Sequence, residues 1–323
     1  MTLITRRRPP AAVLVLVLAA AAGPFLDNYL LYVLSLVGVY VIFALGYNLL
    51  MGYAGQFDFG QGAFLAIGAY ASAVLQVKAG MPFAIALPMG GVIAVMFGLV
   101  IGVIVLRLSG FYLALVTLGF HQTVVLGIAL WETVTGGFQG MTVPRPAALG
   151  LGENLLMFYI VAGVALLMVQ AAVNILRSRI GTAFVAIRES DIAAQAMGVN
   201  LTRHRVLAYG ISAFYGGIAG GLLSMLLSYI TPEGFGMVET LKVLTMITVG
   251  GMGSVAGSVI GAAVLTLSTE MLRLPKVSLE ITNGVLLMLF IMLMPTGIFG
   301  LYGRLRGRFK RGAPISPASA HPE

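Results

Sequence analysis

Long runs of apolar residues are the feature that most restricts how this chain can fold. A helix rises about 1.5 Å per residue and the hydrocarbon layer of a membrane is about 30 Å thick, so about 20 apolar residues are enough to cross it. About ten such runs cover residues 11–26, 29–51, 60–77, 83–106, 111–130, 155–176, 206–230, 237–251, 255–272 and 281–301. Only 9% of the 323 residues are charged, which is too few for the polar shell of a soluble domain. The sequence therefore predicts an all-α, polytopic transmembrane helical bundle.

The basic residues predict the orientation of this bundle, because cytoplasmic loops of membrane proteins are enriched in Lys and Arg. If Arg6, Arg7 and Arg8 hold the N-terminus in the cytoplasm, ten crossings return the C-terminus to the same side, and 14 of the 19 basic residues lie there. The outer segments keep Lys78, Arg145, Lys242, Arg273 and Lys276. Membrane orientation thus explains the net charge of +8. Nucleic-acid binding would need basic residues gathered on a soluble face.

Three segments leave alternatives open. Residues 11–26 fit a retained first span or a secretory signal, and the second span that follows closely favours a retained helix. Residues 237–251 are short for a crossing and form either a full span or a half-helix before the turn GGMGS. The outer loop 131–154 contacts a partner or is a plain connector.

We treat residues 1–311 as one membrane domain and residues 312–323 as a disordered tail rich in Pro, Ala and Ser.

The inner loop 177–205 is the one long charged segment inside an otherwise apolar chain. Its charged residues each cost about 2.5–3.5 kcal/mol near the bilayer centre, so the loop lies in water or at the membrane surface. Phe184 and Ile187 recur at helical spacing, and Ser190 or Asp191 can cap a second short helix. The loop therefore predicts two short helices whose apolar residues face either the chain's own membrane domain or a soluble partner.

Several kinds of chemistry find no support in the residues. The chain has no cysteine, and its three histidines are far apart and lack a neighbouring ligand, so neither a metal site nor another cofactor is indicated. Paired carboxylates or a Ser-His arrangement that would mark an enzyme are also lacking. No Gly-Lys dipeptide occurs, so there is no phosphate-binding P-loop, and ATP would have to be hydrolysed by separate subunits.

Polar residues near the spans are candidates for a solute path, because each costs free energy unless it faces water, protein or a solute. These residues are Asn48, Gln56, Asp58, Gln61, Thr117, His121, Gln122 and Asn283. Each either bonds within the chain or lines the path.

Small residues predict where helices pack closely. Gly253, Gly257 and Gly261 are spaced four residues apart, which places them on one face of an expected helix. Gly98 with Gly102, and Gly216 with Gly220, show the same spacing.

Five stretches, in chain order, carry a family resemblance. They read GYAGQFDFGQGAFLAIGAYA (52–71), RLSGFYLALVTLGF (107–120), TGGFQGM (135–141), SRIGTAFVAIRESDIAAQAMGV (178–199) and VGGMGSVAGSVIGA (249–262). Together they resemble the M-type permease subunit of bacterial ABC importers for branched-chain amino acids. The similarity covers nearly the whole chain from the second span onward.

This resemblance implies a multi-pass protein of the bacterial inner membrane that is a transport subunit and not itself an enzyme. It implies a pore made with a second, different permease subunit, two cytoplasmic ATPase subunits and a periplasmic substrate-binding protein. The loop 177–205 corresponds to the coupling helix, which sits in a cleft of the ATPase. The residues expected to couple the two are Phe184, Ile187, Arg188, Glu189, Asp191, Met197 and Gly198.

The chain departs from the family pattern at Asp58 and Gln61, where Ser and His are more usual, and its outer loop near Trp131 is shorter. These departures leave the solute open, since related permeases carry urea, amides or aromatic acids. The main alternative is a secondary transporter driven by an ion gradient, which would need titratable groups deep in the membrane. His121 is the main candidate for such a group, and Glu270 and Glu280 lie closer to span ends.

Overall fold

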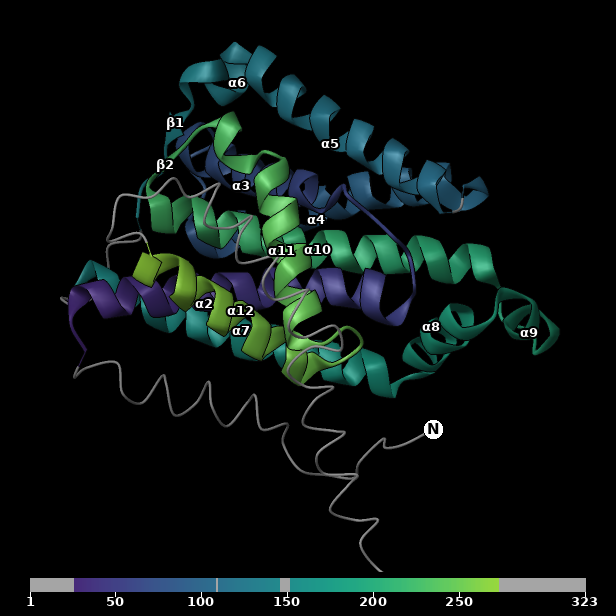
Figure 1. Ribbon diagram of the computed structural model, residues 1–323. Coiled ribbons are helices and arrows are strands. Elements are labelled where there is room, and N and C mark those ends of the chain that lie inside the picture. The colour runs from purple at the N-terminus through teal and green to yellow at the C-terminus, as the bar shows by residue number, and fades with distance from the viewer. Residues whose placement is uncertain (1–25, 109, 146–151, 273–323) are drawn as a thin grey trace, which may run out of the picture.

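Helices dominate the computed structural model, which describes residues 26–108, 110–145 and 152–272 (Figure 1). Two short strands, β1 (Met141–Thr142) and β2 (Tyr229–Ile230), pair antiparallel at one end of the bundle. These strands have only two residues each, and every other regular element of the described residues is a helix, so the all-α prediction is confirmed for them. The expected span 281–301, nearly all of the span 11–26, Asn283 and the tail 312–323 lie outside them.

The long helices follow the expected apolar runs. They are α2 (Asn28–Tyr47) with its continuation as a π-helix, η2 (Asn48–Tyr53), then α3 (Gln61–Val77), α4 (Phe83–Ile104), α5 (Phe111–Leu130), α7 (Glu153–Arg177), α10 (Leu201–Leu227), α11 (Met237–Gly250) and α12 (Val255–Leu272). The short helices are η3 (Val105–Arg107), α6 (Glu132–Thr135), η4 (Gly137–Gln139), α8 (Arg179–Glu189), α9 (Asp191–Ala196) and η5 (Pro232–Phe235). Within the described residues, five helices are long and apolar enough to cross a membrane: α2 with η2, α4, α5, α7 and α10. The protein is thus a multi-pass membrane protein, and the total of about ten spans stays a prediction.

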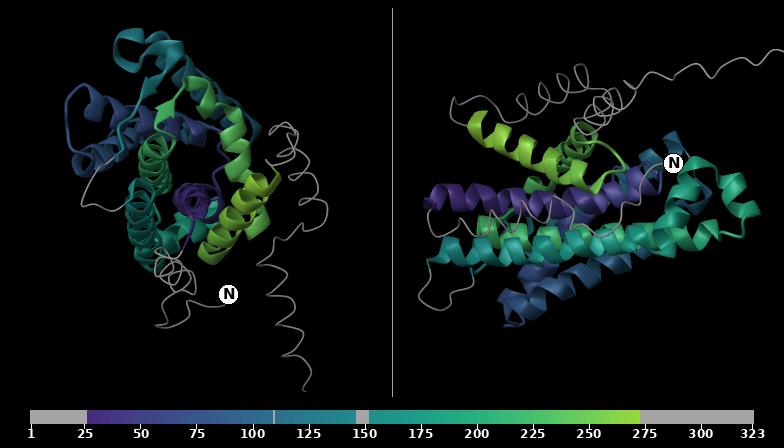
Figure 2. Two further views of the ribbon diagram at one scale, coloured as in Figure 1. Left: turned by 90° about the vertical axis from the view of Figure 1, so that its left-hand side faces the viewer. Right: turned by 90° about the horizontal axis from the view of Figure 1, so that it is seen from below.

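The bundle is built around α2 and α10. Figure 2 shows α2 end-on inside a ring formed by the other helices. The apolar windows of α2 and α10 are 72% and 83% buried, whereas that of α5 is only 22% buried. Helices α8 and α9 lie at the end of the bundle opposite β1 and β2, and we call these the α8–α9 end and the β1–β2 end (Figure 1).

Glycines bring α10 into backbone contact with α3 and α4. A Cβ atom added to Gly68 of α3 would lie 2.2 Å from the backbone of Gly217, and one added to Gly220 would lie 2.0 Å from the carbonyl of Leu65. A Cβ atom on Gly98 of α4 would lie 2.4 Å from the Cβ of Ala213. Because lipid tails are as apolar as Leu, such close contacts, and not hydrophobic exclusion from water, hold membrane helices together.

The chain between α10 and α12 crosses the bundle in an irregular way. After β2 it enters as the 3-10 helix η5, where the buried Phe235 packs on Tyr70 of α3 and its carbonyl lies 2.8 Å from Nε2 of His121, at the middle of α5. Helix α11 then begins inside the bundle and has 14 residues, which is about 21 Å and less than a membrane thickness. The helix alone is therefore too short for a full crossing, and whether residues 237–251 cross the membrane stays a prediction.

The glycines after α11 pack as expected, with one correction. Gly257 and Gly261 of α12 lie against Gly250, since a Cβ atom on Gly257 would be 2.6 Å from the Gly250 carbonyl. Gly253 does not share this face, because it lies in the turn before α12 with φ +75°. This turn needs a residue in the left-handed conformation, which glycine adopts readily. The regular helix that carries Gly257 and Gly261 on one face begins only after it.

We predict that Gly68→Val destabilises the fold, because the new side chain has no room beside Gly217. Overpacking of this kind costs about 1–3 kcal/mol or more. The measurement is the thermal unfolding midpoint of the purified protein in detergent. Gly163→Val is the matched control, because nothing lies within 4 Å of a Cβ atom there. Equal midpoints for the two variants would contradict the packing described here.

Candidate functional site

Two short helices form the α8–α9 end, as the sequence predicts. Ser178 caps α8, its Oγ accepting from the Ile180 amide at 3.2 Å, and Ser190 caps α9, its Oγ accepting from the Ala193 amide at 3.3 Å. Gly198 follows α9 with φ +81°, the left-handed conformation that ends many helices. Local sequence thus determines both helix starts and the stop.

The apolar residues of this segment separate into a buried set and an exposed set. Phe184 is fully buried and Ile187 is 4% exposed, and Phe184 packs with Tyr209 in one core cluster. Ile192 and Met197 are 83% and 84% exposed. Of the two alternatives that the sequence leaves open for their side chains, Phe184 and Ile187 pack on the chain's own helices and anchor α8 there, and their role in coupling stays a prediction.

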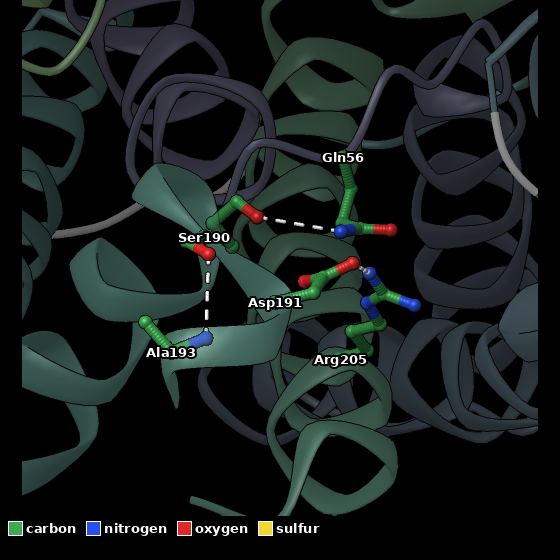
Figure 3. Close-up of polar contacts among 6 residues, drawn as sticks. Gln56, Ser190, Asp191, Ala193 and Arg205 are labelled. Atoms are coloured by element: carbon green, nitrogen blue, oxygen red, sulfur yellow. Dashed lines mark hydrogen bonds and ion pairs between the residues drawn. The ribbon is translucent and has the colours of Figure 1, made fainter. Parts of the chain in front are cut away.

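An ion pair ties α9 to α10. Nη2 of Arg205 lies 2.6 Å from Oδ2 of Asp191, and Figure 3 shows the side chain of Gln56 pointing toward this pair. Gln56 is buried, and its Nε2 donates to the carbonyl of Ala54 at 3.3 Å. Sequence reasoning chose Asp191 but not Arg205. The signal available was an acid at the start of one helix and a base in the second turn of the next.

Asn48 joins three parts of the chain at the place where α2 becomes η2. Its Oδ1 accepts from the Gly253 amide at 2.9 Å, and its Nδ2 donates to the carbonyl of Ser254 at 3.0 Å and to Oγ of Ser258 at 2.7 Å. Asn48 is only 1% exposed. Of its two possible roles, the structure places it in internal hydrogen bonding.

Asp58 is buried in the connection between η2 and α3. Burial raises the pKa of its carboxyl from 3.8 to about 7, although the Gly60 amide and Thr117 lower the pKa in part. Its Oδ2 has no hydrogen-bond partner among the described residues. Its own backbone carbonyl accepts a hydrogen bond from the hydroxyl of Tyr47. The buried carboxyl is therefore neutral over a wide range below neutral pH.

The remaining path candidates also divide by burial. Gln61 accepts from Oγ of Ser212 at 3.0 Å, and Oγ1 of Thr117 accepts from the Phe59 amide at 3.0 Å. His121 lies beside Phe235, as described above, and Gln122 differs from the other six path candidates that the structure describes because it is exposed. The hydroxyl partners of Gln61, His121 and Asn48 are those of Ser212, Thr240 and Ser258. Sequence reasoning did not select these partners, since hydroxyls in apolar helices give little signal before the helices are packed.

A cavity of about 320 Å³ lies between α2, α10, α11 and α12. Nζ of Lys242 lies 2.6 Å from the hydroxyl of Tyr40, and that hydroxyl donates to Oε2 of Glu239 at 2.9 Å. Sequence reasoning placed Lys242 in an outer segment, and that orientation stays a prediction. Lys242 and Glu239 contact Tyr40 in the middle of α2, because η5 carries the chain inward before α11 begins. The cavity is also lined by Leu36, Leu223, Leu227, Glu233, Val238 and Glu270.

Comparison with known proteins now gives the family. The family described as "Branched-chain amino acid transport system / permease component" matches residues 29–294. The chain belongs to this permease family. The match spans every helix described above from α3 to α12 and nearly all of α2.

The permease is similar to named relatives along most of its length. The "High-affinity branched-chain amino acid transport system permease protein LivM" of Escherichia coli is 31% identical over 91% of this chain and 75% of the relative. LivM of Salmonella typhimurium is 31% identical over 84% of this chain and 71% of the relative. The permease protein LivH of Escherichia coli is 26% identical over 82% and 92%. No solved structure shows a significant match to the permease.

We predict that Asp58→Asn stabilises the permease more strongly at alkaline pH than at acidic pH. The folded pKa of about 7 exceeds the unfolded value of 3.8, so the folded state binds the proton more tightly. That stabilisation is complete below the unfolded pKa and is lost as pH rises through about 7, by about 1.4 kcal/mol for each pH unit between the two pKa values. The check is the difference in thermal midpoint from the unsubstituted protein, measured at pH 5.5 and at pH 8.5.

Glu189→Gln is the control for Asp58→Asn. The hydrogen bond from Arg188 lowers the pKa of the exposed Glu189, so this carboxylate stays ionised throughout that range. Its substitution should change the midpoint equally at both pH values. A midpoint difference for Asp58→Asn that is also independent of pH would show that Asp58 is ionised in the folded protein.

Proposed function

We propose that this permease is the membrane-spanning subunit of an ATP-driven importer of the bacterial inner membrane, and that it forms half of the path for branched-chain amino acids or a related small amphipathic solute. The observation that carries the proposal is the α8–α9 end, an anchored pair of helices that exposes Ile192 and Met197. The LivM and LivH relatives, named as branched-chain amino acid permeases, support the solute class. ATP hydrolysis then belongs to two separate cytoplasmic subunits.

The α8–α9 end is the proposed docking surface for the ATPase. Phe184 and Ile187 fix α8 to the bundle, and the Asp191–Arg205 ion pair fixes α9 to α10. A docking element must stay in a fixed position relative to the bundle when its partner moves. These contacts hold α8 and α9 in such a position. Ile192 and Met197 then offer apolar area to the partner, with Glu189, Asp191 and Gly198 around them. The proposal puts the α8–α9 end on the cytoplasmic side, so the β1–β2 end faces a periplasmic binding protein. It keeps the prediction from the basic residues that both chain termini are cytoplasmic.

The exposed face of α5 is the proposed contact with a second permease subunit. Large apolar residues such as Met96 and Val100 cover the exposed face of α4, which suits lipid. The exposed face of α5 instead includes Gly119, Gln122 and Gly127 among its apolar residues. Small residues allow another backbone to approach, and an amide inside the membrane is costly unless it faces protein or water.

The cavity beside α11 matches the chemistry of an amino acid zwitterion. Glu233 and Glu239 are acceptors for an ammonium group, Lys242 is a donor for a carboxylate, and Leu223 and Leu227 are apolar neighbours for a side chain. A weakly polar cavity is enough where a separate binding protein supplies specificity. We therefore assign this cavity to the solute path of the permease.

Reconstitution tests the proposed function directly. The permease is placed in proteoliposomes with its second permease, ATPase and binding-protein partners, and uptake of labelled leucine, isoleucine and valine is compared with that of urea, an aliphatic amide and phenylalanine. Uptake should require ATP hydrolysis and the ATPase subunits. Uptake by this chain alone, driven by an ion gradient without ATP, would instead establish a secondary transporter, for which the partly buried Glu239 and Lys242 would be the groups to examine.

We predict that the double variant Ile192→Ser and Met197→Ser weakens ATPase binding without destabilising the permease, since both side chains are more than 80% exposed. Burial of one large apolar side chain contributes about 1.5–3 kcal/mol, so each loss should weaken binding about tenfold or more. Co-purification and a titration with the isolated ATPase measure the effect. Leu167→Ser, on an α7 position that is 71% exposed, is the matched control. Unchanged affinity in the double variant would remove α9 from the docking surface.

A further inference from the structure

Arg188 is the residue of α8 that reaches furthest from its own segment. It lies in the last turn of α8, and its Nη1 donates to the carbonyl of Gly52 at 2.7 Å, across 136 residues of chain. Its Nη2 donates to Oε1 of Glu189 at 2.8 Å. One guanidinium therefore joins the α8–α9 end to η2, the π-helical end of α2.

Two glycines make room for this side chain, and a third accepts its hydrogen bond. A Cβ atom on Gly55 would lie 2.9 Å from Cγ of Arg188, and one on Gly253 would lie 3.0 Å from Nη1. Gly55 and Gly253 both have positive φ, at +69° and +75°. The third glycine, Gly52, supplies the accepting carbonyl. The stem and the head of Arg188 thus fit into space that only glycine leaves open.

The same place is joined to the turn between α11 and α12. Asn48, one turn before Gly52, accepts from the Gly253 amide and donates to Ser254 and Ser258. Arg188, Gly52, Asn48 and Gly253 consequently form one connected set, which we call the Arg188 clamp. It holds together α8, the end of α2 and the start of α12.

Hydrogen-bond geometry explains why an arginine is needed. The last carbonyls of a helix have no partner inside it, and a basic side chain can satisfy them. In η2 the carbonyls of Leu49 and Leu50 accept from Ala54 and Gln56, and Arg188 supplies the donor for Gly52. The planar fork of a guanidinium donates in two fixed directions at once, here to Gly52 and to Glu189, which a lysine ammonium cannot match in one plane.

We propose that Arg188 transmits movement of the α8–α9 end to α2 and to the α11–α12 turn, and so couples ATP hydrolysis to solute movement. This inference rests on the proposed ATPase-driven function. The other anchors of α8, Phe184 and Ile187, are apolar contacts that allow sliding and rotation. The charge-assisted bond to Gly52 is directional, so it transfers a shift of α8 to the backbone of the membrane helices. Arg188 is thus a positioning residue that acts through the helix ends it holds.

The experiment uses the complete reconstituted importer and measures two quantities, labelled leucine taken up and ATP hydrolysed. In Arg188→Met the ratio of uptake to hydrolysis should fall about tenfold, the factor expected for loss of one charge-assisted hydrogen bond, while ATPase binding persists. Arg188→Lys keeps the charge but has one ammonium nitrogen in place of the planar fork, so its ratio should fall between those of Arg188→Met and the unsubstituted protein. Arg179→Met removes an exposed arginine from the same helix and leaves the bond to Gly52 in place, so it should keep the unsubstituted ratio.

The outcomes separate this inference from the proposed function. If the unsubstituted importer shows no ATP-dependent uptake, both are overturned together. If it does, and Arg188→Met keeps the normal ratio, the Arg188 clamp is overturned while the importer stands. Where Arg188→Met does not assemble, Arg188→Lys decides: a lowered ratio with intact assembly supports transmission, and a normal ratio shows a purely structural role.

Discussion

Backbone contact between α10 and its neighbours is the constraint on which the rest of the fold depends. In lipid there is no gain from removing apolar surface from water, so helices associate where their backbones can approach and pack. Gly217 and Gly220 on α10, with Gly68 on α3, provide that approach. Helix α10 then has a fixed position, and α4, α2 and β2 are arranged against it. Its second turn carries Arg205, so the α8–α9 end is also positioned by the same helix.

Breaks in the helices are the second constraint, because lipid offers no partner for a free backbone group. The protein breaks its helices at η2, between β2 and α11, and at the turn before α12. Each break comes with a polar side chain: Asn48 at η2 and at the turn, His121 beside Phe235, and Thr240, whose Oγ1 accepts from the Gly62 amide at 3.0 Å. The polar residues that stand out in an apolar sequence are thus largely the ones that stabilise irregular backbone.

Much of this architecture could be predicted from the sequence, because helix length and helix capping are local properties. The apolar runs placed the long helices, and Ser190 and Gly198 marked α9 correctly. Burial could not be predicted in the same way. Phe184 and Met197 are both apolar residues of one charged loop, yet one is buried and the other exposed, since only the packed bundle determines which side of α8 and α9 faces it. The contact of Glu239 and Lys242 with Tyr40 could not be predicted for a related reason, since η5 carries the chain inward by a route that has no helical periodicity.

The position of the Arg188 clamp follows from what a moving membrane protein requires. An intact helix resists bending because each turn is held by its own hydrogen bonds, so a displacement is most easily taken up where that ladder is interrupted. The clamp holds two such interruptions, η2 and the turn at Gly253, and it holds them from a helix whose opposite side is open to a partner. A single bond to the middle of α2 would act on an uninterrupted helix, which resists bending. Placed at the interruptions, the same bond can change the direction of α2 and α12 relative to α10, whose glycine contacts keep it fixed.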